Sequence, residues 1–213
     1  IMVILIILIV ISVVLISEGE RKIPIQYAKR VVGRKMYGGQ STHIPVKVNM
    51  GGVMPIVFAS AVLAIPSTIS LFFGNGGQSG ITNFFQNTTG GFIVYLIIQS
   101  ALILIFAYFY NQIQFNTVEY AKQLQQNGGF IPGIRPGKPT SEYLAKVATR
   151  ITFIGSIALA LLTIIPAIAS KLLGLSLSFG GSSVIIVVGV IIETIKQLEA
   201  MMTMKQYKGF LNR

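Results

Sequence analysis

Five long apolar segments dominate the pattern of hydrophobic and polar residues along this chain. A helix needs about 20 apolar residues to cross a hydrocarbon core of roughly 30 Å. The segments that reach or approach this length are 1–17, 53–73, 92–111, 151–170 and 182–204. In lipid only helices or closed barrels satisfy the backbone, and barrel strands would alternate polar and apolar residues, which these segments do not. The pattern therefore predicts an all-α membrane protein with five transmembrane helices.

Composition supports the membrane interpretation. The 213 residues are 53% hydrophobic and 11% charged, with a mean hydropathy of +0.73, whereas soluble domains carry roughly 25% charged residues. The chain begins inside an apolar run at Ile1 without a basic leader or a cleavage site. We therefore expect a fragment of a longer chain, and not a signal peptide, at this end.

The net charge of +11 is unevenly distributed and predicts an orientation. Sixteen of the 17 Lys and Arg residues fall in the connections 18–52 and 112–150 or in the last turns and tail. The connections 74–91 and 171–181 hold Lys171 alone. Because basic loops stay in the cytosol or against anionic lipid, 18–52, 112–150 and the C-terminus are predicted to be cytosolic.

Both cytosolic connections carry local patterns of their own. Alternating runs at 23–31 and 44–48 flank a Gly-containing stretch and predict a β-hairpin with Arg34 and Lys35 near its tip. The second connection has a helical stretch at 117–126 and then two Pro-Gly pairs on either side of Arg135. Such pairs form compact turns, so Arg135 is expected to be held out from the bilayer.

The residues that carry enzyme chemistry are scarce. The sequence has no Asp, no Cys and a single His, His43, which is best explained as an ordinary loop residue. The Gly-rich stretch 74–77 lacks the Lys-Ser/Thr that follows a phosphate-binding loop. We expect no catalysis, no metal and no cofactor.

Two features of the apolar segments leave alternatives open. Glu193 lies roughly 17 Å along the last segment at 1.5 Å per residue, so it marks either an ion pathway or, as we favour, a helix end bordering the cytosol. Lys196 and Glu199 follow at i+3 spacings and could pair with it. The second segment contains Pro55 and Pro66, which predict a kinked helix that is either a moving part or an ordinary membrane helix.

Specific strings then indicate a family. IPIQYAKR at 23–30, GRK at 33–35 and QSTHIPVKVN at 40–49 resemble the loop between the sixth and seventh helices of the SecY family. GVMPIVFAS at 52–60 resembles the start of its seventh helix, FIPGIRPG at 130–137 its loop between helices eight and nine, and FGGSS at 179–183 the start of its tenth. The resemblance runs from end to end and implies helices six to ten, one half of a ten-helix clamshell channel.

The resemblance also implies roles for single residues. Val57 and Ile186 stand where this half contributes to a ring of aliphatic side chains at the waist of the pore. Val57 departs from the more usual Ile, which puts only the tightness of the ring in question. Such a ring would act as a deformable gasket that dewets and blocks ions when it is shut. The second segment would form one side of a lateral gate, with Asn49, Pro55 and Ser60 along it.

The implied function is that of the central channel subunit of the Sec protein translocase in the bacterial plasma membrane. It passes unfolded secretory polypeptides across the membrane and releases transmembrane segments into lipid. Implied partners are SecE, SecG, the motor ATPase SecA, the ribosome, signal-sequence-bearing preproteins and the N-terminal half of the same channel, with anionic lipid around the basic loops. ATP hydrolysis would belong to SecA. The docking residues would be Arg135, Lys29, Arg30, Arg34 and Lys35.

Two other classes of function remain to be weighed. A small-solute transporter predicts unwound helices around a polar site at the midplane of the membrane. An adaptor without a pore would leave the aliphatic ring and the proline-containing helix without a purpose.

Overall fold

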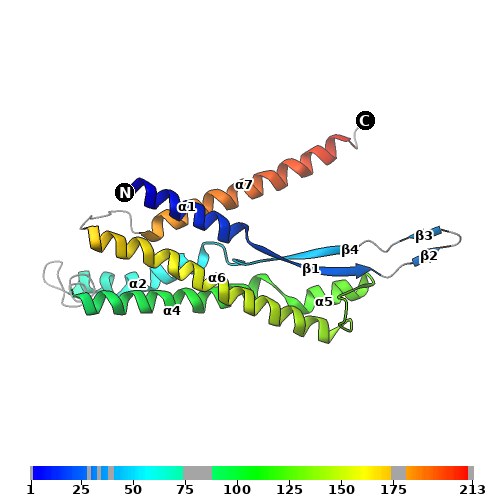
Figure 1. Cartoon of the computed structure of the whole chain (residues 1–213), viewed down its shortest axis with the longest axis horizontal. Helices are drawn as coiled ribbons and strands as arrows, with labels where there is room; N and C mark the ends of the chain where they lie inside the picture. Colours follow the sequence, from blue (N-terminus) through cyan, green and yellow to red (C-terminus); the bar gives the residue numbers. More distant parts are fainter. Residues whose placement is uncertain are drawn as a thin grey trace.

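Helices make up most of the structure (Figure 1). The computed structural model describes residues 2–27, 30–32, 35–37, 41–73, 88–173 and 181–210. The helices are α1 (Met2–Glu18), α2 (Met54–Phe73), α4 (Thr89–Gln114), α5 (Thr117–Gln126), α6 (Lys138–Leu173) and α7 (Gly181–Phe210). The strands are β1 (Glu20–Tyr27), β2 (Arg30–Val32), β3 (Lys35–Tyr37), β4 (Ser41–Lys47) and β5 (Gly129–Phe130).

Each of the five predicted segments lies within a helix to within one residue at its start, but the helices differ in length. Within the described part of the chain, Gly90–Gln126 and Lys138–Ala169 are long and apolar enough to cross a membrane. The apolar helical stretches Ile6–Glu18 and Met54–Ile69 are shorter. The number of five membrane spans therefore stays a prediction.

The helix α6 begins at Lys138, well before the segment 151–170. Pro139 lies in its first turn, where a missing N–H costs no helical hydrogen bond. The early part of α6 is amphipathic, because Leu144, Val147 and Ala148 are buried while Thr149 and Arg150 are exposed. Burial of this face explains why the helix extends into the predicted loop 112–150.

The predicted hairpin is confirmed, and it is longer than expected. β1 and β4 pair antiparallel with Ile23 opposite Ile44, while β2 and β3 pair beyond them. Val48 donates a backbone hydrogen bond of 2.8 Å to Gly19 and closes the base of the hairpin. In Figure 1 the hairpin projects away from the helices α1 and α2. The connections 74–91 and 171–181 fall largely outside the described residues.

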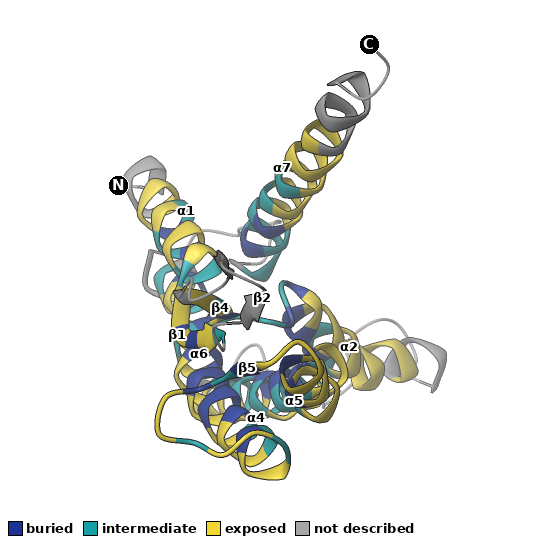
Figure 2. Ribbon diagram, turned by 90° about the vertical axis from the view of Figure 1, so that its right-hand side faces the viewer, coloured by how far each residue is buried: buried dark blue, intermediate teal, exposed yellow. Residues whose placement is uncertain are grey.

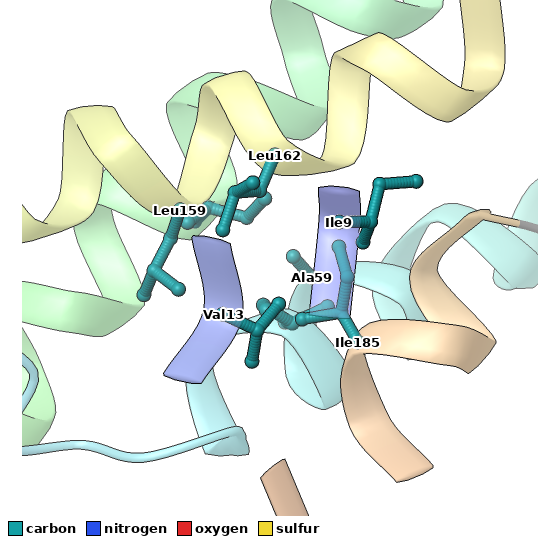
Figure 3. Packing of buried hydrophobic residues seen from close by; sticks show 8 residues of the cluster. Ile9, Val13, Ala59, Leu159, Leu162 and Ile185 are labelled. Carbon is teal, nitrogen blue, oxygen red and sulfur yellow. The ribbon is translucent and has the colours of Figure 1, made fainter. Parts of the chain in front are cut away.

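Two separate clusters of buried apolar side chains hold the fold together. The helical cluster joins five helices, as Figure 3 shows in part, and consists of Ile9, Val13, Ile56, Ala59, Ile103, Leu159, Leu162 and Ile185. The loop cluster joins β1, β4, the end of α4 and the start of α6, and consists of Ile23, Val46, Phe115, Ile131, Leu144, Val147, Ala148 and Ile151. The helix α6 contributes to both clusters.

Candidate channel constriction and cytosolic docking surface

The turn that leads into α2 is fixed by local hydrogen bonds. The side-chain amide of Asn49 donates to the carbonyl of Gly52 at 2.9 Å, and the N–H of Met54 donates to Gly51 at 3.2 Å. Gly52 has a φ of +60°, a conformation that glycine adopts without strain. Asn49, which sequence reasoning assigned to the lateral gate, thus also shapes the entry to the helix.

The two prolines of α2 differ in their effect. Pro55 is fully buried in the first turn, where its missing N–H costs no helical hydrogen bond, so the prediction that it kinks the helix is wrong. Pro66 lies inside the helix. Near it, the hydroxyls of Ser67 and Thr68 each donate to the carbonyl of Ala64 at 2.8 Å. Any weakness of this helix therefore lies at Pro66.

Ile186 lies at the edge of the helical cluster, and Val57 is next in sequence to one of its members. Val57 follows the buried Ile56 on α2 and is itself 36% exposed. Ile186 follows Ile185, which is 1% exposed, and packs against the cluster from α7. The structure thus places both residues on helices that the cluster holds together. Ser60, one turn beyond Val57, is half-buried, and its hydroxyl has no hydrogen-bond partner among the described residues.

A cavity of about 230 Å³ lies between the start of α2 and the middle of α7. Its walls include Asn49, Gly189 and Glu193. Lys196 also lines it and pairs with Glu18 of α1 at 2.7 Å. Sequence reasoning considered pairs within the last helix and missed Glu18, because the approach of α1 to α7 has no signal in local spacing.

The Arg135 turn has the predicted compact form. Gly133 and Gly137 have φ of +83° and +101°, and the N–H of Ile134 donates to Ile131 at 3.0 Å. The buried hydroxyl of Thr140, in the first turn of α6, donates to the carbonyl of Arg135 at 2.8 Å. The side chain of Arg135 is exposed. The turn is thus fixed from both ends, while its arginine faces outward.

The two predicted cytosolic connections form one unit. β5, next to the Arg135 turn, pairs with β1 through Gln26 opposite Phe130 and Tyr27 opposite Gly129. This strand has two residues, too few for an alternating pattern, and sequence reasoning missed it. Ile131, just before the Arg135 turn, lies in the same buried cluster as Ile23 of β1 and Val46 of β4. The Arg135 turn therefore has a fixed position relative to the base of the hairpin.

The basic residues predicted on the hairpin are only partly described. Arg30 lies on β2 opposite Tyr37, and Lys35 lies on β3 opposite Val32. Lys29 and Arg34 fall outside the described residues. Across the described part of the chain, no group of three or more His, Cys, Asp or Glu residues could hold a metal ion.

Comparison with known proteins gives one consistent result. The family model SecY matches residues 1–195. Relatives named protein translocase subunit SecY are 46% identical in Streptomyces galbus and 42% identical in Thermotoga maritima, over 93% and 95% of this chain. The chain covers 46% of each, so it spans about half the length of these relatives.

Solved structures agree on the fold. A structure described as that of a protein conducting channel superposes with a TM-score of 0.65 at 21% identity, over 93% of this chain and 48% of the other. A second, described by the plug domain of the SecY protein, gives the same TM-score over 49% of its length. The strings at 23–60 and 130–137, the helical fold and the family match point the same way: this chain belongs to the SecY family.

Proposed function

We propose that this chain forms one half of a protein-conducting channel, the central subunit of a Sec-type translocase. The observation that carries the proposal is the family match over residues 1–195. Relatives that share 42–46% identity with the chain are named as translocase subunits. The chain spans half of their length, so the channel would be completed by an N-terminal half with five further helices, and the five apolar segments would be its own spans.

The constriction of this channel would include Val57 and Ile186. Both are aliphatic and lie on different helices; Ile186 packs against the helical cluster, and Val57 follows Ile56, a member of that cluster. The exposed surface of Val57 is available to face a pore. A ring of such side chains excludes ions by dewetting and deforms around an extended polypeptide. The helix α2, with Asn49, Pro55 and Ser60 near its cytosolic end, would form one side of a lateral gate into lipid.

The cytosolic face would dock SecA or, alternatively, the ribosome. Arg135 is exposed on a turn whose backbone is fixed, and a guanidinium on a rigid turn suits recognition of carboxylates or phosphates. Lys29, Arg30, Arg34 and Lys35 would add positive charge for acidic protein surfaces or ribosomal RNA. This orientation puts the basic loops and the C-terminus in the cytosol, next to anionic lipid. SecE and SecG would complete the complex, and SecA would hydrolyse the ATP.

The proposal is tested by reconstitution of the full-length protein with SecE and SecG in liposomes. We expect ATP- and SecA-dependent import of a signal-bearing preprotein into a protease-protected space. Samples without ATP, without SecA, or with a preprotein that lacks its signal sequence are the controls. Uptake of a small solute without import of the preprotein would overturn the channel assignment in favour of a transporter.

A further inference from the structure

The helices α2 and α7 meet in one small area near the cytosolic side of the proposed constriction. α2 packs mainly on α4, whereas α7 packs mainly on α1, and contact between α2 and α7 is limited. Figure 2 shows the two helices leaving the centre of the molecule in different directions. The separation of α2 and α7 therefore depends on few residues.

Val53 and Gly189 form the centre of this contact. A Cβ added at Gly189 would overlap the Cγ1 of Val53, so the absence of a side chain on α7 makes room for the valine. Val53 is 8% exposed. One turn further along α7, Glu193 approaches Gly52, where an added Cβ would lie 3.6 Å from the carboxylate oxygen Oε2. Residues four apart share one face of a helix, so Gly189 and Glu193 together face the start of α2.

Val53 is held firmly on its own side of the contact. Its carbonyl accepts hydrogen bonds from the N–H groups of Ile56 at 3.1 Å and Val57 at 3.2 Å. The turn before it is closed by the bond from Asn49 to Gly52. Behind the turn, a Cβ added at Gly51 would lie 3.0 Å from the Cγ of Pro55 and 3.1 Å from the Cβ of Tyr110. Val53 thus cannot withdraw easily, and a larger residue at 189 would displace α7.

We infer that Gly189 is a positioning residue that sets the spacing of α2 and α7, and through it the tightness of the constriction. Val57 lies four residues beyond Val53 on α2, and Ile186 lies three residues before Gly189 on α7. At 1.5 Å per residue, both lie about 4.5–6 Å from the contact, in the direction away from the cytosolic end. The inference rests on the proposed function, because it takes Val57 and Ile186 as members of the ring.

The test measures the spacing of α2 and α7 separately from the sealing of the channel against ions. These 213 residues contain no cysteine, so, once any cysteines in the rest of the full-length protein and its partner subunits have been replaced, a pair of labels can be introduced at Val62→Cys on α2 and Val187→Cys on α7, two exposed positions. The full-length channel, reconstituted with its partner subunits, is spin-labelled there, and the distance is measured by pulsed electron paramagnetic resonance. In parallel, the resting ion conductance of the unlabelled channel is measured in a planar bilayer without preprotein.

We expect Gly189→Ala to lengthen the distance between the labels and to raise the resting conductance several-fold. Val53→Ala removes the atom that the new Cβ would meet, so the double variant should regain both the distance and the low conductance. Val53→Leu, which adds bulk from the other side, should also lengthen the distance. Gly90→Ala is the matched control, because nothing lies within 4 Å of a Cβ at that position.

The outcomes separate the two claims. An unchanged distance in Gly189→Ala and Val53→Leu would overturn the positioning role, whatever the conductance. A longer distance with an unchanged conductance would overturn the assignment of Val57 and Ile186 to the seal. Failure of the double variant to regain the wild-type distance would show that the overlap with Val53 is not the cause.

Discussion

Glycine serves different purposes at one position in the Arg135 turn and at two positions in the helices. Gly133, in the Arg135 turn, has a φ of +83° and nothing within 4 Å of an added Cβ, so the backbone conformation requires it. Gly155 and Gly189 lie in helices, and an added Cβ would overlap the carbonyl oxygen of Val48 or the Cγ1 of Val53. The Arg135 turn therefore depends on backbone conformation at Gly133, whereas these two helical positions depend on close approach.

The two apolar clusters differ in a similar way. The loop cluster lies under a hairpin and an amphipathic stretch of α6, and in the proposed orientation it is bounded by water. Burial from water stabilises it. The helical cluster would be surrounded by lipid, where apolar side chains gain little by leaving one hydrocarbon environment for another. Tight packing must then stabilise it.

The substitution Arg135→Glu should affect the function of the loop region and leave that of the helical region unchanged. It reverses one exposed charge without altering the apolar clusters or the glycines that form the turn. We expect SecA-driven import to be lost, while the amount of protein in the membrane and its resting ion conductance stay at the wild-type level. Import and conductance in the reconstituted channel measure the two effects.

A charge reversal on the same surface is the control for Arg135→Glu. Lys138→Glu changes an exposed residue three positions away, at the start of α6, and should slow import much less. Normal import by Arg135→Glu would contradict the docking role of the turn. A leak of ions in that variant would show that the loop and helical regions are not independent.

Two leucines on α6 compare the clusters directly. Leu144, in the loop cluster, is 0% exposed, and Leu159, in the helical cluster, is 3% exposed. Leu144→Ala loses burial from water as well as packing, so we expect it to cost about 2–5 kcal/mol of local stability. Leu159→Ala loses mainly packing in lipid and should cost less. Hydrogen exchange of β1, β4 and α6 in the reconstituted channel measures the difference.

The comparison also predicts where the losses appear. Leu144→Ala should reduce protection of the strand residues opposite each other at the base of the hairpin, and leave α4 near Ile103 protected. Leu159→Ala should reduce protection of α4 near Ile103 and leave the strand residues at the base of the hairpin protected. Equal costs for the two variants would contradict the idea that different forces stabilise the two clusters.

The sequence predicted the two regions unequally well. The hairpin followed from alternation about Ile23 and Ile44, and the Arg135 turn from its Pro-Gly pairs, because both signals are local. The early start of α6 at Lys138 was not predicted. Its first part is amphipathic, and a search for long apolar runs assigns such a stretch to a loop. The pairing of β1 with β5 was also missed, because two residues carry no periodic pattern.

The sequence also predicted some features of the candidate site and missed others. The strings around Val57, Ile186 and Arg135 identified a family and, through it, three positions. The contact of Val53 with Gly189 and the pair of Lys196 with Glu18 bring together residues far apart in the chain. Their proximity depends on how helices pack, and no spacing in a single sequence encodes it.

Gly155→Ala tests the role of close approach where the helix α6 meets the base of the hairpin. Alanine favours a helix over glycine by about 1 kcal/mol, but the new Cβ would overlap the backbone oxygen of Val48. That oxygen belongs to the residue whose N–H is bonded to Gly19, so it cannot rotate away as a side chain can. Overpacking of this kind typically costs about 1–3 kcal/mol, and we expect a net loss of stability with faster hydrogen exchange at the base of the hairpin.

A neighbouring helix position provides the reference for Gly155→Ala. Ser156→Ala, at a buried residue whose hydroxyl bonds to the carbonyl of Phe153 within the same helix, removes an atom instead of adding one and should have a smaller effect. Stability equal to or above wild type in Gly155→Ala would mean that helix propensity outweighs the overlap.

Gly133→Ala isolates backbone conformation in the loop region. No atom lies within 4 Å of the added Cβ, so the cost arises from the positive φ alone, about 1–2 kcal/mol for an L-residue. Pro132 before it and the hydrogen bond from Ile134 to Ile131 are retained, and the turn should loosen without collapsing. We expect import to slow moderately, measured in the same assay as Arg135→Glu.

Gly133→Asn is the control for this prediction. It should slow import less than Gly133→Ala does, because Asn tolerates a positive φ better than Ala. A larger loss for Asn than for Ala would mean that side-chain bulk, and not backbone strain, limits the turn, and glycine would then serve close approach here as well.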